Sequence, residues 1–158
     1  MRRFAFLLPC LVLVGAACQR VTDRANTTPM VSAVTTPDAP LRETRWTVFA
    51  MGGQPLAPAA SPDQVPYLLI SDAGTAEGMS GCNRFRGGLK PAETDGQLEF
   101  VNLGSTRMAC PLMDTEHKFT QALDATRYYH ISGDTLRLYT SAERTGTPLV
   151  QLVAAKMP

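Results

Sequence analysis

The sequence predicts a mainly β fold, a small antiparallel barrel-like sheet of about seven or eight strands with one packed α-helix. Three observations support this prediction. Short segments alternate apolar and polar residues, as strands with one buried face do. Twelve glycines and twelve prolines among 158 residues place turn signals between these segments. One stretch alone repeats its apolar residues at helical spacing.

The first half of the chain holds three of the expected strands. Trp46 and Val48 alternate on one face of residues 45–50, which end at a glycine pair and so predict a strand followed by a turn. Residues 54–64 contain three prolines and are expected to form a loop. A second strand is predicted at 65–71 and a third near 76–82, after an Asp-Ala-Gly turn.

The second half of the chain also alternates short predicted strands and turns, on both sides of the predicted helix. The segment 83–88 is bounded by glycines and favours a sharp turn, and 90–96 favours a polar loop before a strand at 97–103. A three-stranded meander is predicted at the C-terminal end, with strands at 127–132, 135–139 and 148–154.

The predicted helix covers residues 112–126. Pro111 precedes its first turn, and Asp114 and Glu116 lie near the positive end of the helix dipole. Its candidate inner face has five residues at helical spacing: Leu112, Glu116, Phe119, Ala122 and Leu123.

Charge excludes one class of partner. The net charge is +1, and without Arg2 and Arg3 of the N-terminal segment there are 15 − 2 = 13 basic residues against 14 acidic ones. A near-neutral domain has no electrostatic footprint for nucleic acid, so no nucleic-acid partner is expected.

The N-terminus predicts export. Two arginines precede a 14-residue apolar run from Phe4 to Ala17, which is too short for a membrane-spanning helix and typical of a signal peptide. The run ends Val-Gly-Ala-Ala before Cys18 and resembles the lipobox of bacterial lipoproteins. We therefore expect a signal peptide at 1–17 and a lipid on Cys18 that attaches the protein to a membrane.

The resemblance to lipoproteins also implies a location. Gln19 follows the cysteine, where an Asp commonly retains such proteins in the inner membrane, so the outer membrane, facing the periplasm, is expected. Residues 18–43 lack aromatic residues and periodicity, which predicts a lipidated, disordered tether before a domain at 44–158.

Two motifs in the domain stand out. The first is Ser80-Gly81-Cys82-Asn83-Arg84-Phe85-Arg86-Gly87-Gly88, and the second is Gly104-Ser105-Thr106-Arg107-Met108-Ala109-Cys110-Pro111. Together with Trp46 and the hairpin at 133–138, they resemble the META domain family, also called HslJ-like, over roughly Leu41 to Ala154. The resemblance implies a small mainly β barrel with a packed helix, and an envelope role linked to heat shock or antibiotic tolerance.

Cys82 and Cys110 are the two cysteines left in the domain once Cys18 carries lipid. An even pair in an oxidising compartment predicts a disulfide, and a pair of buried free thiols is the alternative. With His117 and His130 the pair could also form a metal site, although the spacing matches no compact zinc finger. Cys82 with His117 could act as nucleophile and base only if the thiol were free. We expect no metal, no cofactor and no catalytic residue.

The first motif also admits a binding interpretation. Gly81, Asn83, Gly87 and Gly88 suit a turn with positive φ angles, where Arg84, Arg86 and Arg107 could converge around an anion. The alternative is a structural corner with solvated arginines, which we favour because glycine-rich turns without a phosphate-loop pattern are common. The candidate binding corner comprises Gly81, Asn83, Arg84, Phe85, Gly87, Thr106, Arg107 and Met108.

Function is expected to be non-enzymatic. The leading hypothesis is an envelope module that binds an envelope protein or a small ligand and supports stress tolerance. The alternatives are a small-ligand carrier, with the ligand inside the barrel, and an inhibitor of a hydrolase or a hydrolase itself. At this length Trp46, Phe100 and Leu136 are expected to fill the interior.

Overall fold

A computed structural model describes residues 37–155 of the chain. The predicted signal peptide, the Cys18 expected to carry lipid and most of the predicted tether lie outside these residues. Within the described range no helix is both long enough and apolar enough to cross a bilayer.

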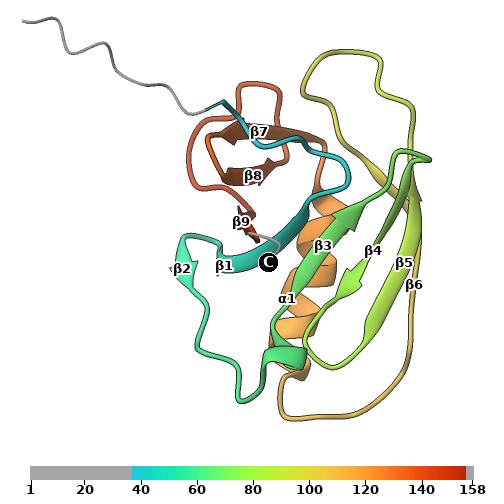
Figure 1. Ribbon diagram of the computed structural model, residues 1–158, viewed down its shortest axis with the longest axis vertical. Helices are drawn as coiled ribbons and strands as arrows, with labels where there is room; N and C mark the ends of the chain where they lie inside the picture. Colours follow the sequence, from blue (N-terminus) through green and yellow to red (C-terminus); the bar gives the residue numbers. More distant parts are fainter. Residues whose placement is uncertain (1–36, 156–158) are drawn as a thin grey trace, which may run out of the picture. The chain divides into compact units, whose positions relative to one another are not determined.

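The fold is mainly β, as predicted, and consists of a curled half-barrel sheet with one helix (Figure 1). The described part of the chain forms nine strands, all paired antiparallel, where the sequence predicted seven or eight. Their order across the sheet is β6-β5-β4-β3-β1-β9-β8-β7, with β2 paired to β1. The bounds are β1 Arg45–Met51, β2 Gln54–Pro55, β3 Tyr67–Ile70, β4 Thr75–Met79, β5 Arg84–Leu89, β6 Phe100–Ser105, β7 Tyr128–Ser132, β8 Thr135–Tyr139 and β9 Val150–Ala154, with a 3-10 turn at Pro62–Gln64.

Alternation along the strands builds the core. In β1, Trp46, Val48 and Ala50 are buried while Arg45 and Phe49 are exposed, because successive side chains of a strand point to opposite faces. The inner faces of the other strands add apolar side chains to the same cluster, and the interior positions expected from the sequence are filled. The core includes Trp46, Leu68, Ile70, Phe85, Phe100, Phe119, Leu123, Leu136, Leu138, Val150 and Leu152.

The helix α1, Met113–Ala125, packs against this inner face (Figure 1). Phe119 and Leu123 are fully buried in the core, and the ring of Phe119 meets that of Phe85 edge-on with centroids 5.8 Å apart. The helix follows Pro111 and Leu112 and is capped at its C-terminal end by Thr126, whose hydroxyl donates to the Ala122 carbonyl. The predicted helix at 112–126 is thus present and one residue shorter at each end.

The two ends of the sheet approach each other at one point. Gln97 bridges to Tyr128 of β7, and the Leu98 N–H donates to the Arg127 carbonyl over 2.9 Å. The segment just before β6 therefore pairs with the outer edge of β7 and covers part of that edge. Beyond this bridge β6 is hydrogen-bonded on one side, to β5, and α1 lies beside it.

The prediction for residues 83–88 is wrong. This segment was expected to form a sharp turn, but Arg84–Leu89 is strand β5, between β4 and β6. Asn83, Gly87 and Gly88 do not have positive φ angles; of the four residues proposed for the turn, Gly81 alone does, at 132°. The strand predicted at 97–103 is also displaced, since β6 begins at Phe100 and continues to Ser105.

The last residues of the predicted tether belong to the domain. The Asp38 carboxylate accepts a hydrogen bond from the Gly133 N–H, and the Ala39 N–H donates to the Gly133 carbonyl. The Trp46 indole N–H donates to the Leu41 carbonyl over 3.0 Å, and Leu41 packs against the core. The domain therefore begins about six residues earlier than the composition predicted, since these residues gain packing that their local sequence does not show.

Candidate functional site

The two sequence motifs meet at one corner of the domain. A disulfide joins Cys82, in the β4–β5 connection, to Cys110, in the segment between β6 and α1. Their Cα atoms lie 6.1 Å apart across a sequence separation of 28 residues, within the usual span of a disulfide. The bridge predicted from cysteine number and compartment is therefore present. Because both sulfurs are bonded, neither can serve as a thiolate nucleophile or metal ligand.

Asn83 is the centre of this corner. It is 1% exposed, and its amide nitrogen donates to the Met108 carbonyl over 2.9 Å and to the Glu116 carboxylate over 2.8 Å. Its amide oxygen accepts from the Met108 N–H and the Thr106 hydroxyl, each over 2.7 Å. One side chain therefore links the β4–β5 connection, the segment after β6 and α1, with full use of its donors and acceptors.

Glu116 completes the network from the helix. Its side chain lies on the buried face of α1, and its carboxylate also accepts from the Asn83 backbone N–H over 3.1 Å. A buried carboxylate is stable only when hydrogen bonds replace its hydration, and three N–H···O contacts from Asn83 do so here. The corner is a closed polar cluster in which each of these groups is satisfied by another part of the chain.

Glycines allow the strands around the corner to approach closely. A Cβ on Gly87 would lie 2.7 Å from the Val101 carbonyl oxygen and 2.8 Å from a methyl group of Leu103. A Cβ on Gly78 would overlap the Tyr67 carbonyl oxygen and the Phe85 ring. Gly78 and Gly87 thus allow close strand packing, and Gly81 provides the one positive φ angle among the glycines of the first motif.

The three arginines do not converge on one anion site. Arg84 and Arg86 flank the buried Phe85 and so lie on the outer face of β5, where they line a shallow hollow of about 550 Å³. Arg86 forms an ion pair with Glu77 at 3.4 Å. Arg107 lines a different hollow, together with Met108 and Asn83. The structure favours a structural corner over an anion nest.

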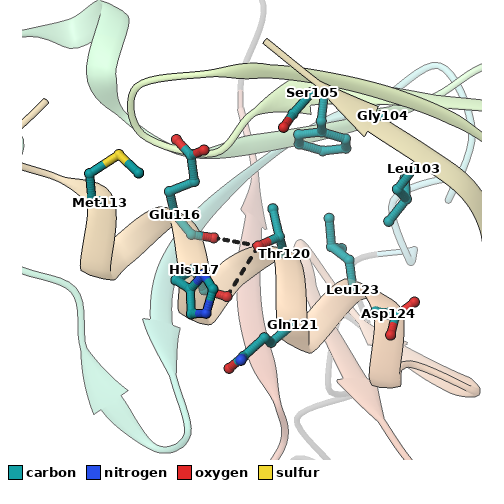
Figure 2. A pocket seen from close by; sticks show the side chains of 11 residues that line it. Leu103, Gly104, Ser105, Met113, Glu116, His117, Thr120, Gln121, Leu123 and Asp124 are labelled. Carbon is teal, nitrogen blue, oxygen red and sulfur yellow. Dashed lines mark hydrogen bonds between the residues drawn. The ribbon is translucent and has the colours of Figure 1, made fainter. Parts of the chain in front are cut away.

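A groove opens next to the corner, between α1 and the strands β5 and β6 (Figure 2). Its volume is about 400 Å³. Figure 2 shows the helix along one side, with Met113 at one end, Asp124 at the other and Thr120 between them. The Thr120 hydroxyl contacts the carbonyls of Glu116 and His117 in the preceding turn. The lining residues are Phe85, Leu103, Gly104, Ser105, Met113, Glu116, His117, Thr120, Gln121, Leu123 and Asp124.

The two histidines lie apart. His117 is exposed and lines the groove, whereas His130 is exposed on β7, paired in register with Arg137 of β8. Within residues 37–155 no three His, Cys, Asp or Glu side chains form a group able to hold a metal ion.

Sequence reasoning missed the part played by Glu116 and the groove beside α1. The signal for Glu116 was present, because it is the one acidic residue among the apolar positions of the helix face. An acidic residue at such a position indicates a buried partner, although not which one. The groove left no such signal, because it forms only when β5, β6 and α1, three separate segments of the chain, pack together.

Comparisons with known proteins agree with this description. The META domain profile matches residues 39–155. No curated protein matches the chain. Three solved structures are similar to it. The first is an NMR structure with 21% identity and a TM-score of 0.53, covering 72% of this chain and 90% of that one.

The second is an NMR structure of a protein from Burkholderia xenovorans, with 27% identity and a TM-score of 0.56, covering 74% of this chain and 85% of that one. The third is a crystal structure of a DUF4847 family protein from Bacteroides vulgatus ATCC 8482, with 17% identity and a TM-score of 0.50, covering 75% of this chain and 96% of that one. The match to the family profile covers nearly all of the described domain, including both motifs that the disulfide joins. The chain therefore belongs to the META domain family.

Proposed function

We propose that this protein is a lipid-anchored, non-enzymatic binding module of a bacterial envelope, held at the outer membrane on its periplasmic side, where it supports stress tolerance. The proposal depends on one observation: the conspicuous side chains of the two motifs contact other parts of the domain and not a ligand site. Cys82, Cys110 and Asn83 resemble reactive or ligand-binding residues in the sequence, yet each is bound to another part of the fold. Side chains used in this way stabilise a scaffold, and the groove beside α1 is one surface that this scaffold offers to a partner.

Two further features support binding on the outside of the domain. The side chains of Trp46, Leu68 and Leu136 are fully buried in the interior of the sheet, which leaves a carrier function less room than the expected barrel would. About twenty residues separate Cys18 from Asp38, and a flexible chain of that length reaches on the order of 25 Å. The proposed anchor would then keep the domain near the membrane and clear of its headgroups.

Acylation is tested by metabolic labelling with palmitate. The wild-type chain is expected to incorporate the label and Cys18→Ala to lose it, because the acyl chains are attached at that residue. Several acyl chains anchor a protein far more firmly than one, so Cys18→Ala is also expected to leave the membrane fraction. Equal labelling of both proteins would remove the anchor from the proposal.

Binding is tested by photo-crosslinking in living cells. Gln121 lines the groove and is exposed, so a photo-crosslinking residue there is expected to capture a discrete partner. The matched control places the same residue at His130, which is exposed on β7 outside the groove. Products of the same size and yield at both positions would contradict a binding role for the groove.

A further inference from the structure

We propose that the groove between α1 and β6 binds an extended polypeptide segment of a partner, and that this segment carries an apolar side chain next to a lysine or arginine. The proposal rests on the proposed binding function and names the class of ligand. Four features of the described residues lead to it: apolar side chains at the groove, a rigid rim, a length that suits a short extended chain, and a negative lining.

Exposed apolar side chains are concentrated at one end of the groove. Among residues 37–155 the exposed large hydrophobic side chains are Phe49, Met108 and Met113, with exposed fractions of 41%, 61% and 46%. Met113 lines the groove, and Met108 and Met113 together line the hollow next to it. Unbranched, polarisable methionine side chains adapt to different apolar partners, so their exposure here indicates a contact surface.

The rim that bears Met108 is held rigidly. Its backbone N–H and carbonyl are both bound by the Asn83 side chain, and the nearby disulfide closes the same segment. The network uses the backbone of Met108 and leaves its side chain in solvent. A partner that covers this side chain would not have to order the loop first, which favours affinity.

The groove is long enough for a short extended peptide. Met113 and Asp124 lie at opposite ends of it in Figure 2 and are eleven residues apart on the helix, which is about 16 Å at 1.5 Å per residue. An extended chain rises about 3.3 Å per residue, so about five residues span this length. On the other side, Leu103 and Ser105 belong to β6, the terminal strand of the sheet, whose outer edge can hydrogen-bond an extended backbone.

The charge of the lining selects the partner. Glu116 and Asp124 line the groove, and none of its lining residues is lysine or arginine. Glu116 is 8% exposed and already bound to Asn83, whereas Asp124 is exposed. Charge complementarity therefore favours a partner with a lysine or arginine at the Asp124 end, and the exposed Met113 favours an apolar residue at the opposite end.

The test uses the full chain carrying Cys18→Ser, purified with its disulfide intact, and two blocked pentapeptides. One has the sequence Val-Lys-Leu-Lys-Val and the other replaces both lysines with glutamate. Each is titrated to millimolar concentration against the labelled protein while amide NMR shifts are followed. The lysine peptide is expected to shift the amides of Leu103, Ser105 and α1, and the glutamate peptide to bind at least roughly threefold more weakly.

Matched variants locate the contacts. Asp124→Lys is expected to weaken binding of the lysine peptide about threefold. Asp114→Lys makes the same change on the same helix outside the groove and is expected to weaken binding less than about twofold. Met113→Ser is expected to weaken binding of the lysine peptide about fivefold, whereas Phe49→Ser, at an exposed apolar residue outside the groove, is expected to leave it unchanged.

The outcomes separate this inference from the proposed function. Absence of binding by the lysine peptide to the folded protein, or equal effects of Asp124→Lys and Asp114→Lys, would overturn the peptide assignment. The crosslink at Gln121 would still show whether the groove binds another kind of partner. A groove-specific crosslink with no peptide binding thus rejects the ligand class alone, whereas loss of both rejects the binding function as well.

Discussion

Asn83 shows how one residue can decide the structure of a corner. Its side chain and backbone connect the β4–β5 connection to the segment after β6 and to α1, through partners that lie 23 to 33 residues away. An aspartate has nearly the same shape, but it has no N–H group to donate to Glu116 or to the Met108 carbonyl. Replacing Asn83 by aspartate therefore changes the hydrogen bonds and charge of this corner while it leaves the packing nearly the same.

Asn83→Asp is expected to lower the free energy of unfolding by about 3–5 kcal/mol, because it places a second carboxylate beside the buried Glu116. Urea denaturation of the full chain measures the loss. Asn102→Asp, at an exposed asparagine of β6, is the control and should change stability by less than about 0.5 kcal/mol.

The pair Asn83 and Glu116 can also be tested as a unit. Combining Asn83→Asp with Glu116→Gln removes the repulsion between the carboxylates, so the double variant should be more stable than the sum of the single losses predicts, by about 1–3 kcal/mol. Strict additivity of the two losses would show that these side chains do not interact.

At the level of elements, β5 and β6 depend on a close approach that glycine permits. Gly87 faces the inner side of the pair, where Val101 and Leu103 leave no room for a Cβ. Gly88, the next residue, has space, since a Cβ there would lie 3.6 Å from a Val101 methyl group. The two adjacent glycines therefore serve different needs, although they look equivalent in the sequence.

Gly87→Val is expected to lower the free energy of unfolding by about 1–3 kcal/mol, because the added side chain must push β6 away from β5. Gly88→Val makes the same chemical change on the open face and should be neutral or slightly stabilising, since valine favours a strand. The midpoint of thermal unfolding distinguishes them, and equal losses at both positions would contradict this account.

The disulfide acts on the same elements. Replacing Cys82 and Cys110 together by alanine is expected to cost about 3–4 kcal/mol, because the bridge closes a loop of about 29 residues and restricts the unfolded chain. Urea denaturation of the wild type with and without reductant should show the same difference. Two titratable thiols in the oxidised, denatured and delipidated wild type would contradict the bridge.

For the whole molecule, the main difference from the sequence prediction is the position of the boundary between tether and domain. Residues 38–43 were predicted as spacer, yet they hydrogen-bond to Gly133, Ile70 and Ser71 and to the Trp46 indole. They thereby connect the N-terminal side of the domain to the β7–β8 turn and to the end of β3. The proposed anchor thus acts on a chain that is fixed to the domain from Asp38 onward.

Two deletions of six residues test this boundary. Removing 38–43 is expected to lower the free energy of unfolding by about 2–4 kcal/mol, because Leu41 leaves the core and Trp46 loses its acceptor. Removing 28–33, within the predicted spacer, should leave the stability of the domain unchanged. Chemical denaturation of both proteins decides, and equal stability of the two would place the boundary after Glu43.

Most of the strands, the helix, the disulfide and the family motifs could be predicted from the sequence alone. The strands and the helix depend on local patterns, such as period-two alternation around Trp46 and helical spacing from Glu116 to Leu123. These patterns are complete within a short stretch of chain, and the disulfide follows from the number of cysteines left in the domain, so neither requires knowledge of the fold.

Only the tertiary structure decided that Arg84–Leu89 is a strand, that Glu116 binds Asn83, and that a groove lies between α1 and β6. The composition of the first motif favours a turn, but pairing with β4 and β6 stabilises an extended backbone there. The physical reason is the same in each case. These features depend on contacts between residues far apart in the chain, and their free energy arises only when the folded sheet brings them together.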